Sequence, residues 1–150
     1  MRKIIGIIGY PLEHSISPAM HQAAFQKLGL DYDYIPFEVT PENLKEALTG
    51  LKALRVRGLN VTIPHKANVM PWLDEIDRAA QMIGAVNTIV KRTDRLIGYN
   101  TDVVGFQRTL IESEVEVKDR ACARLLGLQH KARFTWIVDQ IKCERVLGER

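Results

Sequence analysis

A near-continuous apolar run at residues 3–10 constrains this chain more than any other feature of its sequence. A run of this kind predicts a strand that is buried on both faces, as in a parallel sheet covered by helices. Basic residues precede the run, as they do in a signal peptide, but the run is too short for one and ends at Pro11 and Glu13. We therefore expect a strand here, and a cytoplasmic protein.

Strand and helix signals alternate through the first 117 residues. Ser17 and Pro18 predict a helix with Ser17 as its cap residue, and Gly29 predicts the left-handed end of that helix. Pro71 predicts a break within a later helical stretch. Strands are predicted at 3–10, 32–39, 58–63, 86–91 and 96–99, and helices at 17–28, 41–51, 67–82 and 101–113. This order predicts an α/β fold, with an open layered sheet and flanking helices.

The composition is that of a soluble globular protein, with 46% hydrophobic and 26% charged residues, and no apolar run is long enough to span a membrane. Charge is uneven along the chain. Residues 1–117 carry 13 Lys and Arg against 14 Asp and Glu, whereas residues 118–150 carry 8 against 4. Cys122 and Cys143 both lie in this basic tail and are expected to be free thiols. Apolar residues interleave the tail's charges, so we expect an ordinary segment that contacts neither nucleic acid nor a membrane.

Several kinds of functional site are not predicted. The sequence has no glycine-rich phosphate-binding loop of the GxGxxG or GxxxxGK[ST] type, so no cofactor-binding residues are assigned. The four histidines are scattered and no cysteine lies near the first three, so no metal site is assigned either.

Polar residues instead gather where the predicted strands end, which is where ligands bind in open α/β sheets. Ser15 and Ser17 precede a helix, whose N-terminus favours a carboxylate. The period of two in a strand places Asn60, Thr62 and Pro64 on one face. The other members of the set are Lys66, Asn87 and Asp102. Hydroxyls, amides, one ammonium group and one carboxylate together suit a small polyhydroxylated acid.

Each of these residues also has a purely structural interpretation. Ser17 is a helix cap in any case, and Lys66 could be a solvated surface lysine. Asp102 could be a first-turn charge that interacts with a helix dipole. Asn60 and Asn87 could be turn residues, and His14 and His65 are expected to be positioning or core residues rather than catalysts. The functional interpretation rests on the whole set.

Four segments resemble the substrate-binding domain of shikimate dehydrogenases. They are GYPLEHSISPAMH at 9–21, GLNVTIPHK at 58–66, GAVNT at 84–88 and GYNTDVVG at 98–105, in the order and spacing of that family. The resemblance covers residues 1 to about 118 and implies a two-domain dehydrogenase whose first domain binds the substrate. It implies reversible NADP-dependent reduction of 3-dehydroshikimate to shikimate, an oxidoreductase step in aromatic amino acid biosynthesis.

The resemblance also implies roles for individual residues. Ser15 and Ser17 would bind the substrate carboxylate, and Asn60, Thr62, Asn87 and Asp102 would bind ring hydroxyls. Lys66 would be the acid–base group on the hydroxyl that is oxidised, with Asp102 beside it, so these two would be the catalytic residues.

The resemblance ends near residue 118, where the charge and cysteine pattern also changes. The family continues into a Rossmann domain that binds NADP, but Gly127 is the only glycine between residues 119 and 147. We therefore expect two parts, a substrate-binding domain at 1–118 and a divergent basic tail at 119–150 without a Rossmann fingerprint, as in a truncated dehydrogenase. The alternatives are a non-catalytic module that binds shikimate, or a quinate/shikimate dehydrogenase. Self-association through an uncovered apolar face is a further expectation.

Overall fold

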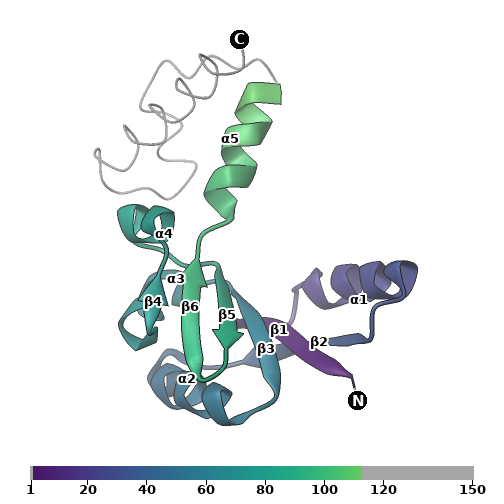
Figure 1. Ribbon diagram of the computed structural model, residues 1–150, viewed down its shortest axis with the longest axis horizontal. Helices are drawn as coiled ribbons and strands as arrows, with labels where there is room; N and C mark the ends of the chain where they lie inside the picture. Colours follow the sequence, from purple (N-terminus) through teal and green to yellow (C-terminus); the bar gives the residue numbers. More distant parts are fainter. Residues whose placement is uncertain (1, 113–150) are drawn as a thin grey trace. The chain divides into compact units, whose positions relative to one another are not determined.

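The structure is a computed structural model that describes residues 2–112 (Figure 1). It divides into two compact units, 1–100 and 101–150. The predicted tail at 119–150, its two cysteines and the predicted domain boundary near 118 lie outside the described residues. No helix within 2–112 is long and apolar enough to cross a membrane.

The elements, in chain order, are β1 Lys3–Gly9, α1 Ser17–Leu28, β2 Tyr32–Glu38, η1 Pro41–Asn43, α2 Leu44–Ala53, β3 Val56–Val61, α3 His65–Asn68, η2 Met70–Trp72, β4 Glu75–Ile76, α4 Arg78–Ile83, β5 Thr88–Arg92, β6 Arg95–Tyr99 and α5 Asp102–Glu112.

The strands of the first unit form one mixed sheet in the order β2-β1-β3-β5-β6-β4. β1 lies between β2 and β3 and is parallel to both, which explains why its apolar run is nearly continuous. β5 is antiparallel to β3, and β5 and β6 form a hairpin. The predicted class, an open α/β sheet with flanking helices, is confirmed.

The two faces of the sheet carry separate apolar clusters, because successive residues of a strand point to opposite faces. Ile8 belongs to the larger cluster, which α2 covers with three leucines at helical spacing, Leu44, Leu48 and Leu51. Its neighbour Ile7 belongs to the smaller cluster, to which α1 contributes only Phe25. The face under α1 therefore has a thinner apolar cover than the face under α2.

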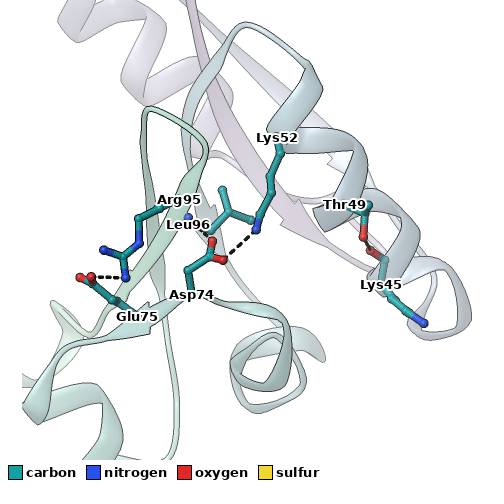
Figure 2. Close-up of polar contacts among 7 residues, drawn as sticks. All are labelled: Lys45, Thr49, Lys52, Asp74, Glu75, Arg95 and Leu96. Atoms are coloured by element: carbon teal, nitrogen blue, oxygen red, sulfur yellow. Dashed lines mark hydrogen bonds and ion pairs between the residues drawn. The ribbon is translucent and has the colours of Figure 1, made fainter.

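The third predicted helical stretch, at 67–82, is wrong in part. Pro71 does mark a break, but the stretch contains the short strand β4 between η2 and α4. Asp74, the residue before β4, fixes the position of this short strand. One of its carboxylate oxygens accepts a hydrogen bond of 2.8 Å from Lys52 on α2. The other accepts a hydrogen bond of 2.7 Å from the backbone N–H of Leu96 on β6 (Figure 2). A second ion pair joins Arg95 to Glu75.

Lys91, near the C-terminal end of β5, caps the C-terminus of α2. The ammonium group of Lys91 on β5 donates hydrogen bonds to the carbonyl oxygens of Leu51, Lys52 and Leu54, at 3.2 Å for Leu51 and 2.6 Å for Leu54. The last carbonyls of a helix lack partners within the helix and carry partial negative charge. The Lys91 ammonium group therefore supplies both the missing hydrogen-bond donors and an opposite charge.

Candidate functional site

Backbone hydrogen bonds join the segments that carry Asn60, Thr62, Lys66 and Asn87, four of the predicted site residues. β1 and β3 end at the same edge of the sheet, and β5, running the other way, begins there. The Thr62 N–H donates to the carbonyl of Ile8 at 3.0 Å, and the Val61 N–H donates to the carbonyl of Asn87 at 2.7 Å. The Asn87 N–H donates in turn to Tyr99 at the end of β6, at 3.0 Å. The ends of β1 and β3, the start of β5 and α3, which follows β3, therefore lie along one edge of the sheet, which we call the rim.

Lys66 lies on this rim in α3, and its main chain is fixed from two sides. Its carbonyl accepts a hydrogen bond of 2.7 Å from the N–H of Val86. The preceding residue, His65, is fully buried, and its Nε2 donates to the carbonyl of Val39 at 2.7 Å. The expectation of a core or positioning role fits the burial of His65. A rigid main chain restricts where the half-buried Lys66 side chain can place its ammonium group.

Asn60 is the last polar residue within β3, and it is half-buried. Its Oδ1 accepts a hydrogen bond of 2.8 Å from the hydroxyl of Tyr34 on β2. The prediction that Asn60, Thr62 and Pro64 share a strand face is wrong beyond Asn60, because β3 ends at Val61. Thr62 makes one more bond to β1, and the chain then turns at Pro64, which precedes α3.

Asn87 is 8% exposed and precedes β5. Its Oδ1 accepts a hydrogen bond of 3.0 Å from the Thr88 hydroxyl. The turn before it is held by Asn100, whose Nδ2 donates to the carbonyl of Ala85 at 2.8 Å. Both asparagines are buried and hydrogen-bonded, so this corner of the rim is rigid.

Ser15 and Ser17 flank the start of α1, but Ser17 is not the cap residue that the sequence predicts. The cap position is Ile16, whose φ of −82° and ψ of −10° are nearly helical, and no side chain caps the helix. Both serines are half-buried, and neither hydroxyl hydrogen-bonds to another described residue. Capping therefore does not explain Ser17, and its hydroxyl is available to a ligand.

The segment with Ser17 is joined to Asn60 through two side chains. Nδ1 of His21 lies 3.0 Å from the carbonyl oxygen of Ser17. A carbonyl only accepts, so Nδ1 carries the proton. The His21 ring stacks on Tyr34, with centroids 4.2 Å apart and planes 15° apart, and Tyr34 bonds to Asn60. Burial raises the pKa of Tyr34 to about 12.

Asp102 is exposed and is the first residue of α5, in the second unit. The structure describes this unit by itself, so the placement of Asp102 beside Lys66 stays a prediction. Of the predicted residues, the structure joins Asn60, Thr62, Lys66 and Asn87 through their main chains, and the turn with Ser15 and Ser17 through His21 and Tyr34.

Two residues that contact the candidate site were missed by sequence reasoning. In the sequence, Tyr34 is one of several aromatic residues in an alternating strand, and His21 is one residue of the helix after Ser17. Neither pattern indicates a contact with the site. The spacing of His21 four residues after Ser17, which favours contact on one helix face, was the available signal.

A sequence profile described as the shikimate dehydrogenase substrate binding domain matches residues 7–89. The NADP(+) shikimate dehydrogenase of Desulforamulus reducens is 57% identical over 110 residues, 73% of this chain and 38% of that protein. The Thermus thermophilus shikimate 5-dehydrogenase, solved in complex with NADP(H) and shikimate, is 37% identical with a TM-score of 0.71, over 79% of this chain and 44% of that one. The ligand-free 5-ketofructose reductase of a Gluconobacter strain is 36% identical with a TM-score of 0.71, over 77% and 41%.

The chain spans between 37% and 50% of the length of eight curated relatives that it matches. The profile match covers more than half of the chain and includes the end of β1, β3, α3 and the turn before β5, the segments that form the rim. The chain therefore belongs to the shikimate dehydrogenase family, which it matches through the substrate-binding domain.

Proposed function

We propose that the first unit binds shikimate and 3-dehydroshikimate, as the substrate-binding part of an NADP-dependent shikimate dehydrogenase. Ser15 and Ser17 hold the carboxylate, and Asn60, Thr62 and Asn87 bind ring hydroxyls. The observation that carries the proposal is the hydrogen-bonded rim, which joins the segments of Asn60, Thr62, Lys66 and Asn87.

Lys66 is the residue proposed to handle the proton of the reacting hydroxyl. In the reduction direction its ammonium group donates a proton to the oxygen that was the carbonyl, and in oxidation its amine accepts that proton. Asp102 is proposed to orient the same hydroxyl. The fixed main chain of Lys66 supports this role, because proton transfer needs a donor held at hydrogen-bond distance.

The residues of the described part do not fit a nicotinamide dinucleotide. A dinucleotide site needs glycines that leave room for the pyrophosphate at a strand-to-helix turn. At the turn after β1, a Cβ added to Gly9 would overlap the side chains of Thr62 and Leu12, so the chain itself fills that space. We derive no hydride step within residues 2–112. NADP is the cofactor of the proposed whole enzyme.

Calorimetric titration of the 150-residue chain with shikimate tests the binding proposal. We expect saturable but weak binding, with a dissociation constant on the order of 1 mM, since a ligand covered on one side stays partly hydrated. The double variant Ser15→Ala/Ser17→Ala should abolish it, while Thr49→Ala, which removes an exposed hydroxyl on α2 outside the proposed site, serves as the control. Equal heats for shikimate and for a cyclohexene carboxylate without hydroxyls would contradict the proposal.

A second candidate is a binding module without catalysis, which the poor fit to a dinucleotide favours for this chain by itself. A steady-state assay with shikimate and NADP separates the two, because only the dehydrogenase produces reduced nicotinamide. We expect no turnover comparable to that of a complete dehydrogenase. Quinate and keto sugars belong in the same assay, since nothing in the rim rejects an additional hydroxyl and one similar structure is a 5-ketofructose reductase.

We also propose a cytoplasmic location, supported by the short N-terminal apolar run, which forms strand β1 in the interior of the sheet, between β2 and β3. Self-association is a further part of the proposal. Ile16 and Met20 at the start of α1 are 77% and 55% exposed, and exposed apolar side chains favour contact with a second copy. Sedimentation velocity over a range of concentrations tests it.

A further inference from the structure

A hydrogen bond crosses a whole strand beneath α1. Tyr34 lies on the edge strand β2 and Asn60 on β3, with β1 between them. Register places Tyr34 beside Ile5 and Asn60 beside Ile7, so both point to the same face of the sheet. Two strand spacings amount to about 9.6 Å, a span that the tyrosine ring and hydroxyl bridge along the surface of β1.

The bond fixes which way round the Asn60 amide lies. A carboxamide has one end that only accepts hydrogen bonds and one that only donates them. Tyr34 is 6% exposed, and Asn60 Oδ1 is the acceptor that its hydroxyl proton meets among the described residues, at 2.8 Å, so the hydroxyl donates to Oδ1. Nδ2 is then the end of Asn60 that remains for a ligand, because Tyr34 is the partner of this side chain among the described residues.

The tyrosine is itself held in place. His21 stacks on its ring at 4.2 Å and is anchored to the Ser17 carbonyl, and Gln22 accepts a hydrogen bond of 3.4 Å from the Tyr34 N–H. A ring that cannot swing keeps its hydroxyl aimed at Asn60. The neighbouring Tyr32 packs on Phe25 instead, and its hydroxyl hydrogen-bonds to no described residue, so it is a natural control.

We propose that Tyr34 is a positioning residue for substrate specificity: it holds Asn60 so that this residue presents only N–H donors, and the ligand oxygen beside Asn60 must accept a hydrogen bond. A hydroxyl or carbonyl oxygen meets this requirement, and an ammonium group at the same place does not. The part of the inference that concerns the ligand rests on the proposed function, whereas the orientation of Asn60 does not.

The orientation is tested without ligand by NMR of the full chain, with the Asn60 side-chain amide assigned through Asn60→Ala. We expect Tyr34→Phe to shift the two Asn60 Nδ2 protons and increase their mobility, and Tyr32→Phe to leave both unchanged. The wild-type chain gives a second readout if Tyr34→Phe does not fold: the hydroxyl proton of Tyr34 should exchange slowly with water. Unmoved Asn60 signals in folded Tyr34→Phe, or fast exchange of that hydroxyl, would overturn the proposal.

The effect on the ligand is tested by a double-mutant cycle of shikimate affinity. We expect Tyr34→Phe to weaken binding about 5- to 10-fold in the wild-type background and to have no further effect in Asn60→Ala. Independent losses that add would show that Tyr34 acts on the fold alone, and would overturn the proposal. If the wild-type chain does not bind shikimate, the proposed function fails, and the amide signals still decide the orientation of Asn60.

Discussion

The carbonyl oxygen of Lys66 accepts a hydrogen bond of 2.7 Å from the backbone N–H of Val86, which joins the loop after β3 to the turn before β5. The bond uses main-chain atoms only. The position of Lys66 is therefore set by the fold, and its side chain can be changed without removing this contact. Main-chain bonds therefore hold the rim together, whereas side chains such as that of Lys66 are what the rim offers to a ligand.

Lys66→Met should weaken shikimate binding and leave the main-chain bond from Val86 to Lys66 in place, so the variant should still fold. Loss of one hydrogen bond from a charged group corresponds to about 1.5–3 kcal/mol, or about 10- to 150-fold in affinity. Calorimetry measures the affinity and thermal unfolding the stability. Lys27→Met, at an exposed position in the last turn of α1, is the matched control and should bind like the wild type. Equal affinities for both variants would contradict the role of Lys66.

Lys91→Met should destabilise the fold without touching the rim. The variant keeps most of the aliphatic stem but removes the ammonium group that caps α2. We expect the free energy of unfolding to fall by about 1–2 kcal/mol, because two helix carbonyls and the carbonyl of Leu54, just after the helix, lose their donor. Urea denaturation followed by circular dichroism provides the value. A change no larger than that of Lys27→Met would show that water replaces the cap at no cost.

Asp74→Asn should remove a pH-dependent part of the stability. The hydrogen bond from Lys52 and then that from the Leu96 N–H lower the pKa of Asp74 below its ordinary value of 3.8. A lowered pKa means that the carboxylate stabilises the fold above that ordinary value, and that the contribution is lost as the pH falls through the folded-state pKa. Wild type should therefore melt at a higher temperature than Asp74→Asn at neutral pH, with the two converging in acid. A constant difference would contradict the ionic origin.

Tyr34 should make the wild type sensitive to alkali. Its pKa is raised from 10.0 to about 12, so between these values the unfolded chain loses a proton that the folded chain keeps. The stabilisation is complete below pH 10 and is lost as the pH rises through the folded value, an effect on the order of 2 kcal/mol. Unfolding of wild type and Tyr34→Phe across this range should give curves that approach each other with pH. Parallel curves would show that Tyr34 titrates normally.

Patterns within single segments of the sequence predict most of the strands and helices. The run at β1, the leucines of α2 and the left-handed Gly29 after α1 depend on neighbours in the sequence, so they were available before the fold. β4 was missed because two residues carry no periodicity, and its place depends on Asp74, which binds partners on α2 and β6.

The candidate site was predicted residue by residue, but its supports were not. The bond from Tyr34 to Asn60 depends on the order β2-β1-β3, which no local pattern specifies. The sequence predicts Ser17 as the cap of α1 because serine before proline usually caps a helix. Ile16 already has a nearly helical backbone, so the helix begins a residue earlier than the side chains suggest. Contacts between distant segments, and small shifts at helix ends, are decided by packing.

The hairpin of β5 and β6 has consequences for how this fold tolerates changes in chain length. Its turn at Thr93 and Asp94 lies at the opposite end of β5 from Asn87, and Thr93 already has a positive φ of 53°. Residues inserted at that turn would lengthen a loop remote from the rim at little entropic cost. A single residue inserted within β5 would reverse which side chains face the core. Natural variation in length should therefore accumulate at the turn, while the strands that lead to Asn87 keep a fixed number of residues.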